Sequence, residues 1–433
     1  MGVRGVQAYI WAVALAVAGV GMAVSDAAAD TLEWALVQAY QNNPSLNAQR
    51  AALRATDENV PQALSGYRPK LSVTAQGGYN YTNALQEFPI GGTVTNVPFA
   101  ETFLSRSVAA NGTYTLFNGF QTANRTRQAE SQVDGARETL RVTEQQVLLD
   151  AATAYMNLLR DQAILDLNRR NVEVLTEQLK QTRDRFNVGE VTRTDVAQAE
   201  SRLAAGRSSL LGAQSNYVTS QANYRRVIGV DPGRLAPGTP VDRLSPNVLA
   251  KAVAQGQANS PSVLAAMYGV DVAALAVKIS EGALYPNLTL TASASQGTNP
   301  AFEVARQTAA SVLGALTVPI YQGGAEYSAI RQSKETLGQQ RLNLDINRDQ
   351  ARATVVQSWG QLDAAKAQIE ATTAQVNAAE IALNGVREEA RVGQPTTLDV
   401  LNAAGAGQCA RRALVTAQHD RAVASYTLLT VKS

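Results

Sequence analysis

Residues 158–192 read LLRDQAILDLNRRNVEVLTEQLKQTRDRFNVGEVT, and in this segment apolar side chains recur every seven positions before a glycine-containing turn. The recurring residues are Leu158, Leu165, Val172, Leu179 and Phe186. An apolar period of seven is the pattern of a left-handed coiled coil. Because no proline occurs between residues 121 and 230, we predict a long helical hairpin over residues 121–228. Its first helix would extend roughly 100 Å at about 1.5 Å per residue, a length that suits a wall or a stalk.

The same pattern occurs a second time, 204 residues further along the chain. The shift gives five more apolar positions, Leu362, Ile369, Val376, Leu383 and Ala390. It also superposes the turn residues, Val188-Gly189 on Val392-Gly393, Thr192 on Thr396 and Asp195 on Asp399. We therefore predict an internal duplication. The first repeat would be residues 30–230 and the second residues 247–433, with its helical hairpin over 324–430. A proline-containing extended linker, residues 231–246, would join them.

Residues 1–29 have the features of a secretory signal peptide. Arg4 precedes an apolar run over residues 10–20, and Ala27-Ala28-Ala29 offers a small-residue cleavage site before Asp30. The alternative is a membrane anchor, but the run is shorter than the roughly 20 residues that a spanning helix needs. We expect cleavage, and we expect no other segment to span a membrane as a helix.

A different period, two, precedes each helical hairpin. Apolar and small residues alternate with hydroxyl and amide residues after Leu71, Ser107, Leu288 and Ser311. This alternation predicts two β-hairpins, at about residues 70–118 and 287–320, with strands of ten to twelve residues. The first hairpin is longer by 13 residues (217 − 204, the shifts that map Pro69 onto Pro286 and Leu116 onto Ile320). We assign the extra residues to a loop over 83–103, and we place the turn of the second hairpin near Asn299-Pro300.

Strands of this length can cross an outer membrane when they tilt. Four strands cannot close a barrel, and open edges cannot lie in lipid. A membrane-spanning barrel would therefore need strands from several chains. Two chains would give eight strands, and three chains would give twelve. The alternatives are an ordinary soluble hairpin within a secreted coiled-coil stalk or adaptor, and an enzyme with an unrecognised site.

Composition argues against several other classes of protein. The net charge of +2 does not indicate the strongly basic surface that is typical of proteins that bind nucleic acid. We find no phosphate-binding loop, no paired metal ligands and no nucleophile with a base, so we expect no enzyme activity and no cofactor. Cys409 and His419 are the only residues of their kinds. We expect Cys409 to be a small packing residue and His419 to lie on a helix surface.

The whole mature chain resembles the TolC family of outer-membrane channel-tunnels. The most specific matches are Arg185-Phe186-Asn187-Val188-Gly189, Thr194-Asp195-Val196, Val392-Gly393, Leu398-Asp399-Val400 and Ala151–Leu158. The resemblance implies a mainly α fold with a membrane β part, in which a homotrimer shares a twelve-stranded β-barrel above a coiled-coil α-barrel. It implies an outer-membrane protein that extends into the periplasm, with an equatorial belt formed by residues 31–43, residues 231–260 and the carboxyl end. A periplasmic adaptor and an inner-membrane ABC exporter or proton-driven pump would be its partners, and proteins or small molecules its cargo.

The resemblance also assigns roles to residues of the two turns. Asp195, Asp399 and Asn402 would lie at the periplasmic entrance, and Val188, Gly189, Thr192, Val392, Gly393 and Thr396 would form the turns that dock the adaptor. The chain departs from the family at Asn402, where an aspartate is usual, at Pro395, where an arginine is usual, and at Ala390, where a tyrosine is usual. The residues by themselves leave another interpretation open. Thr192 with Asp195, and Thr396 with Asp399, have the spacing of helix capping boxes, and Gly189 and Gly393 suit helix ends with positive φ.

Overall fold

The computed structural model describes residues 30–90, 93–244, 246, 248–301, 304–391 and 397–432. The predicted signal peptide, residues 1–29, lies outside this part of the chain. Internal contacts divide the chain into two units. Of the described residues, one unit comprises those within 30–47, 144–252 and 355–431, and the other comprises those within 48–143, 253–354 and 432. The two 67-residue helices, over residues 121–187 and 325–391, therefore contribute to both units.

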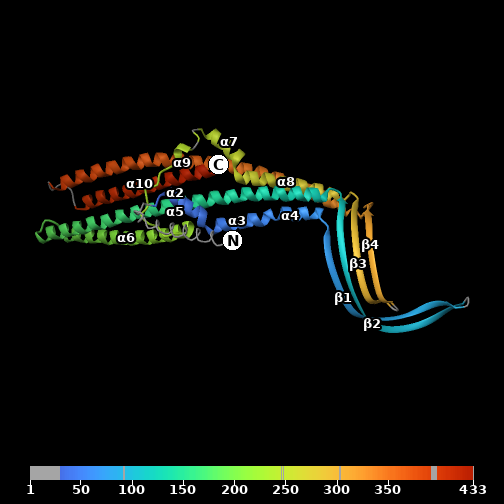
Figure 1. Cartoon of the computed structure of the whole chain (residues 1–433). Helices are drawn as coiled ribbons and strands as arrows, with labels where there is room; N and C mark the ends of the chain where they lie inside the picture. Colours follow the sequence, from blue (N-terminus) through green and yellow to red (C-terminus); the bar gives the residue numbers. More distant parts are fainter. Residues whose placement is uncertain are drawn as a thin grey trace, which may run out of the picture. The chain divides into compact units, whose positions relative to one another are not determined.

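The order of helices and strands repeats, as the sequence predicts. The first series is α2 (Leu32–Asn42), α3 (Pro44–Asp57), α4 (Asn59–Leu64), η1 (Ser65–Tyr67), β1 (Lys70–Ile90), β2 (Thr93–Asn118), α5 (Gln121–Asn187) and α6 (Arg193–Ile228). After η2 (Asp242–Leu244), the second is α7 (Leu249–Asn259), α8 (Pro261–Gly282), β3 (Asn287–Ala301), β4 (Val304–Thr317), α9 (Ala325–Arg391) and α10 (Thr397–Lys432). Helices α5 and α9 both have 67 residues, and α6 and α10 both have 36. Their first residues are 204 positions apart, so the shift found in the sequence holds for the helices (Figure 1).

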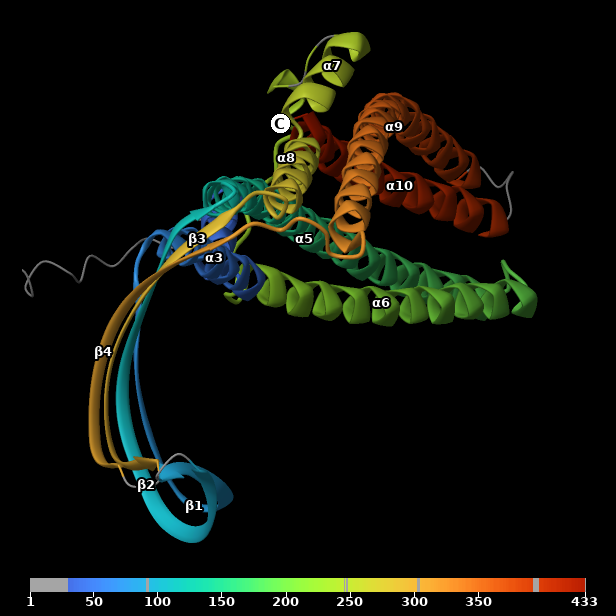
Figure 2. The ribbon, with the colours of Figure 1, turned by 90° about the vertical axis from the view of Figure 1, so that its right-hand side faces the viewer.

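The long helices pair as two antiparallel hairpins, α5 with α6 and α9 with α10 (Figure 2). Seam residues Leu158, Leu165 and Leu179 are buried, with Leu179 packing on Ala199 and Leu203 of α6. In the second hairpin Trp359 and Leu362 pack on Ala424 and Leu428. The buried part of the seven-residue series ends before the turn. Its last member, Phe186, is 42% exposed.

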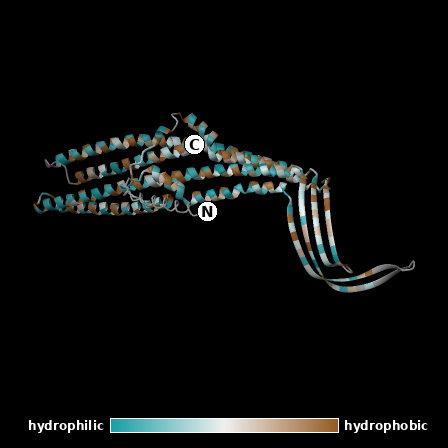
Figure 3. Cartoon of the chain, viewed as in Figure 1, coloured by the Kyte–Doolittle hydropathy of each residue, from teal (hydrophilic) through white to brown (hydrophobic). Residues whose placement is uncertain are grey.

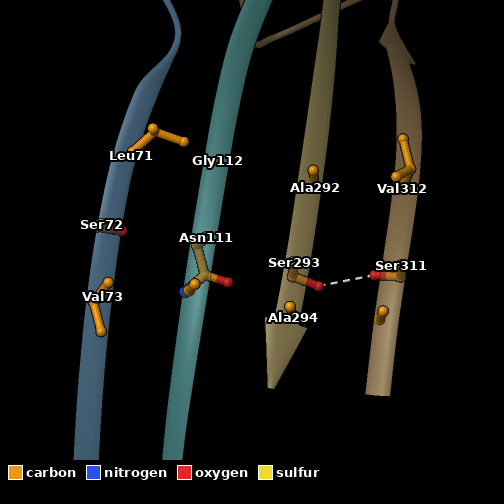
Figure 4. Close-up of a pocket in the computed structure, with 12 residues that line it drawn as sticks. Leu71, Ser72, Val73, Asn111, Gly112, Ala292, Ser293, Ala294, Ser311 and Val312 are labelled. Atoms are coloured by element: carbon orange, nitrogen blue, oxygen red, sulfur yellow. Dashed lines mark hydrogen bonds between the residues drawn. The ribbon is translucent and has the colours of Figure 1, made fainter. Parts of the chain in front are cut away.

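The four strands form one antiparallel sheet in the order β1-β2-β3-β4, with β1 and β4 at its edges. The register aligns Leu71, Gly112, Ala292 and Val312 in one row across the sheet (Figure 4). The next row is Ser72, Asn111, Ser293 and Ser311, in which the two serine hydroxyls are 2.8 Å apart. Because side chains alternate between faces along a strand, the apolar row and the polar row lie on opposite faces. Figure 3 shows the same mixture of hydrophobic and hydrophilic residues along the strands.

The predicted loop over residues 83–103 is wrong. Strands β1 and β2 have 21 and 26 residues, and they stay paired through this segment until Ile90 opposes Thr93. The hairpin therefore continues beyond β3 and β4 as a two-stranded ribbon (Figure 1). Pro89 and Pro98 are tolerated there because each strand of a ribbon has one side without a partner, where a missing N–H costs no ladder hydrogen bond. In the second hairpin β3 likewise continues through Asn299-Pro300 as an irregularity, with φ of Asn299 at 49°.

Among its described residues, the linker after α6 contains one regular helical element, the single turn of η2. Residues 233–236 run beside Asp30, whose carbonyl accepts hydrogen bonds from the Ala236 amide at 3.0 Å and the Tyr155 hydroxyl at 2.8 Å. Further along, Asp242 accepts two hydrogen bonds from Arg421 of α10, at 2.6 and 3.0 Å. The linker is therefore attached to the helices of its unit and is not a free tether.

Three smaller expectations are also corrected. His419 is buried and Cys409 is exposed, the reverse of what we predicted. Among the described residues, one helical segment, Leu249–Gly282, is long and apolar enough to cross a membrane by length and composition alone. It contains the break between α7 and α8, and Val263 of α8 packs in a cluster with Leu344 and Ala351 of α9.

Candidate functional site

The first turn, between α5 and α6, ends one helix and begins the next within six residues. The Gly189 amide donates to the Phe186 carbonyl at 3.0 Å, and the Glu190 amide donates to the Arg185 carbonyl at 2.9 Å. With Gly189 at φ 78°, these bonds make a Schellman motif. The prediction of a helix-ending glycine with positive φ is confirmed here. An ion pair of 3.0 Å between Arg185 and Glu190 also spans the turn.

Thr192 and Asp195 then form a complete capping box at the start of α6. The Thr192 hydroxyl accepts from the Asp195 amide, and the Asp195 carboxylate accepts from the Thr192 amide at 2.9 Å and the Thr192 hydroxyl at 2.7 Å. These hydrogen bonds, the hydroxyl's first, hold the pKa of Asp195 below its ordinary value, since they favour the ionised carboxylate. The capping interpretation is therefore confirmed for this turn.

Between these two caps the turn presents apolar surface to solvent. Val188 is 72% exposed, and a Cβ built on Gly189 would meet no described atom within 4 Å beyond the adjacent residues. A second ion pair, of 2.6 Å between Arg183 and Glu200, joins α5 to α6 just before the turn. The turn is thus rigid in its backbone and open at its tip.

The second turn, residues 392–396, lies outside the described residues. Val392, Gly393, Thr396 and Pro395 are therefore not placed. Asp399 is in the first turn of α10 and is exposed. Asn402, one turn later, accepts a hydrogen bond of 2.8 Å from Nη2 of Arg202 on α6. The first turn's Asp195 is engaged in the cap of its own helix, α6.

Comparison with known proteins identifies the family. A family model described as outer membrane efflux protein matches residues 35–230 and 252–431. The chain belongs to the outer membrane efflux protein family. The efflux protein BepC of Brucella suis biovar 1 (strain 1330) is 40% identical over 419 residues, covering 96% of this chain and 88% of BepC. Outer membrane protein TolC of Escherichia coli (strain K12) is 26% identical over 407 residues, covering 89% of this chain and 79% of TolC.

Solved structures of outer-membrane channels have the same fold. VceC of Vibrio cholerae aligns with a TM-score of 0.76 at 19% identity, covering 93% of this chain and 95% of VceC. The open-state MtrE channel of Neisseria gonorrhoeae aligns with a TM-score of 0.76 at 17% identity, covering 93% of this chain and 88% of MtrE. These likenesses, at under 20% identity, support the fold. Membership of the outer membrane efflux protein family and the 40% identity to BepC place the chain in the outer membrane and periplasm as an exit duct for export. The alternative of a secreted stalk is set aside.

The sequence analysis did not predict the hydrogen bond that Arg202 makes with Asn402. Arg202 lies in an ordinary helical stretch of α6, 200 positions before its partner Asn402, and no local motif indicates it. A second bond joins the two hairpins, from Nε2 of Gln408 on α10 to the Leu167 carbonyl on α5 at 3.1 Å. Only the packing of the hairpins brings these groups together.

Proposed function

We propose that this chain works as a homotrimer in which three four-stranded sheets close one twelve-stranded barrel. The observation that carries the proposal is the sheet itself, with edge strands β1 and β4 and an apolar face made of aligned rows. An edge strand exposes unpaired backbone groups, which lipid cannot satisfy. Pairing β1 of one chain with β4 of the next removes every edge. Channels of this family are trimers that work with adaptors and pumps, which supports the same assembly.

The first turn is the proposed docking surface for a periplasmic adaptor. Val188 offers exposed apolar surface, Gly189 leaves room for close approach of a partner, and Thr192 with Asp195 holds the turn in one conformation. Val392, Gly393 and Thr396 would do the same at the second turn, because the shift of 204 aligns them with the first. The adaptor would connect the tunnel to an inner-membrane ABC exporter or proton-driven pump.

Asp195 and Asp399 are the proposed acidic residues of the periplasmic entrance, and Asn402 is its proposed neutral residue. Both acidic residues begin the helix that follows a turn. Asn402 is neutral and bound to Arg202, so we assign it to holding the entrance closed. In this proposal the chain is a passive conduit: it has no enzyme activity, and its partner transporter supplies the energy for export.

The docking proposal is tested by site-specific photo-crosslinking in cells. A photo-reactive amino acid at Val188 should trap an adaptor protein that mass spectrometry identifies. The same amino acid at Val174, an exposed position of α5 within the coil, is the control. Trimer formation is read separately, by the mass of the detergent-solubilised protein. Crosslinks to an adaptor from Val174 but not from Val188 would reject the turn as the docking surface, and a monomer would reject the shared barrel.

A further inference from the structure

A cavity of about 640 Å³ lies in the unit that contains the linker, and the proposed function does not use it. It is bordered by α5, by linker residues 235–240, by α9 and by α10. Its volume is within the range of pockets that bind drug-sized molecules, about 300–1,000 Å³. Apolar side chains form part of its wall, among them Met156, Leu159 and Ile369.

Two arginines line the cavity, and each has bonds on only part of its guanidinium group. Nε of Arg160 donates to Asp161 at 2.8 Å. Arg421 donates to Asp242 through Nε and Nη2, at 3.0 and 2.6 Å. Within the described part of the chain, these bonds leave both terminal nitrogens of Arg160, and Nη1 of Arg421, for a further acceptor. An arginine has five N–H donors in a planar fork, which suits carboxylate, sulfonate and phosphate groups.

His419 also lines the cavity, and its hydrogen bonding defines its chemical state. Nδ1 lies 2.9 Å from the Asp420 carboxylate, so Nδ1 must carry the proton. Burial lowers the pKa of His419 and favours the neutral ring. Nε2 is then an acceptor, and it has no hydrogen-bond partner among the described residues although His419 is only 9% exposed. A buried acceptor without a partner costs free energy, which a bound donor would recover.

We propose that this cavity binds a small amphipathic anion: an apolar body with an acidic group and an N–H or O–H donor. The acidic group would accept hydrogen bonds from Arg160 and Arg421. The donor would reach Nε2 of His419, and the apolar body would pack on Met156, Leu159 and Ile369. None of the residues that line the cavity belongs to either turn, and the proposal does not depend on the adaptor or on the cargo.

The test uses 8-anilino-1-naphthalenesulfonate, which has an aromatic body, a sulfonate and one N–H group. The full-length mature protein is reconstituted in nanodiscs, and fluorescence titration gives the dissociation constant and the stoichiometry. We expect saturable binding of one molecule per chain. Arg160→Gln and Arg421→Gln should each weaken it by about tenfold, the size expected for losing a charged hydrogen bond. Ala163→Phe, which fills the cavity from α5 without changing charge, should abolish it.

Arg411→Gln is the matched control. Arg411 is also on α10 and also holds a carboxylate, Glu380, at 2.8 Å, but it does not line the cavity. His419→Gln keeps an acceptor and should bind more tightly than His419→Leu. Helical circular dichroism checks that each variant is folded. Absence of saturable binding, or equal loss in Arg411→Gln and the cavity variants, would overturn the proposal.

Discussion

Arg202 on α6 donates a hydrogen bond of 2.8 Å from Nη2 to Oδ1 of Asn402 on α10, and this bond joins a helix of the first repeat to a helix of the second. By contrast, the ion pairs Arg183–Glu200 and Arg411–Glu380 each join the two helices of one hairpin. Asn402 is one of the positions at which the chain departs from the TolC family pattern, and its amide oxygen accepts a hydrogen bond from a guanidinium group.

Removing the link should loosen the closed entrance. Arg202→Gln removes a solvent-exposed hydrogen bond of about 0.5–1 kcal/mol, so we expect about a two- to fivefold rise in closed-state leak. Asn402→Asp adds a charge opposite to Arg202 and should lower the leak. Single-channel conductance in planar bilayers measures both. Arg411→Gln breaks an ion pair within the second hairpin and should leave conductance unchanged; a rise equal to that of Arg202→Gln would refute the role of the link.

The capping box should make the first turn sensitive to acid. Because the folded-state pKa of Asp195 is lowered, its contribution to stability is complete above the ordinary value of 3.8 and is lost as pH falls through the lower folded value. The protection factors of the turn amides, which correct for the intrinsic pH dependence of exchange, should therefore fall below about pH 4 in the wild type. In Asp195→Asn this added loss of protection should be absent. An identical pH profile in both proteins would show that the carboxylate contributes nothing to the cap.

Losing the threonine of the same box should weaken the start of α6 at every pH. Thr192→Ala removes both the acceptor for the Asp195 amide and a donor to its carboxylate, at a cost of about 1 kcal/mol. Thr192→Ser keeps the hydroxyl and should be near wild type. Hydrogen exchange at residues 193–196 at neutral pH distinguishes them. Equal protection in the alanine and serine variants would contradict the prediction.

Close packing of α5 on α6 depends on Gly206. A Cβ at this position would lie 2.8 Å from Cδ1 of Leu175, whereas a Cβ at Gly212 on the same helix would meet no described atom within 4 Å. Gly206→Val should therefore destabilise the hairpin by about 1–3 kcal/mol through overpacking. Gly212→Val should be neutral or stabilising, since glycine is a poor helix former. Thermal unfolding followed by helical circular dichroism compares the unfolding temperatures of the two variants. A lower unfolding temperature for Gly212→Val than for Gly206→Val would show that α5 and α6 are not in close contact at Gly206.

The Schellman motif requires a left-handed residue at position 189. Gly189→Val places a β-branched residue at φ 78°, at a cost of about 1–2 kcal/mol. We expect adaptor-dependent export to fall while the trimer remains intact, because the barrel and coil seams lie elsewhere. Gly212→Val serves as the control for adding the same side chain. Loss of the trimer in Gly189→Val would mean that the turn is needed for folding rather than for docking.

Local sequence determined much of this protein. The seven-residue period, the shift of 204 and the glycine and capping residues predicted both helical hairpins to within a few residues, because helices and caps depend on groups at most five positions apart. Alternation likewise predicted four strands and which residues share a face. Asp195 and Thr192 could be found as a cap for the same reason.

Tertiary structure decided the features that depend on distant partners. Strand pairing extends β1 and β2 through Pro89 and Pro98, because a ribbon with unpaired sides accepts proline and the sequence alone does not show which sides are unpaired. The packing of α10 against α5 and the linker buries His419, and the approach of the two hairpins brings Arg202 to Asn402. The Arg202–Asn402 bond joins residues 200 positions apart, and no short-range period encodes it.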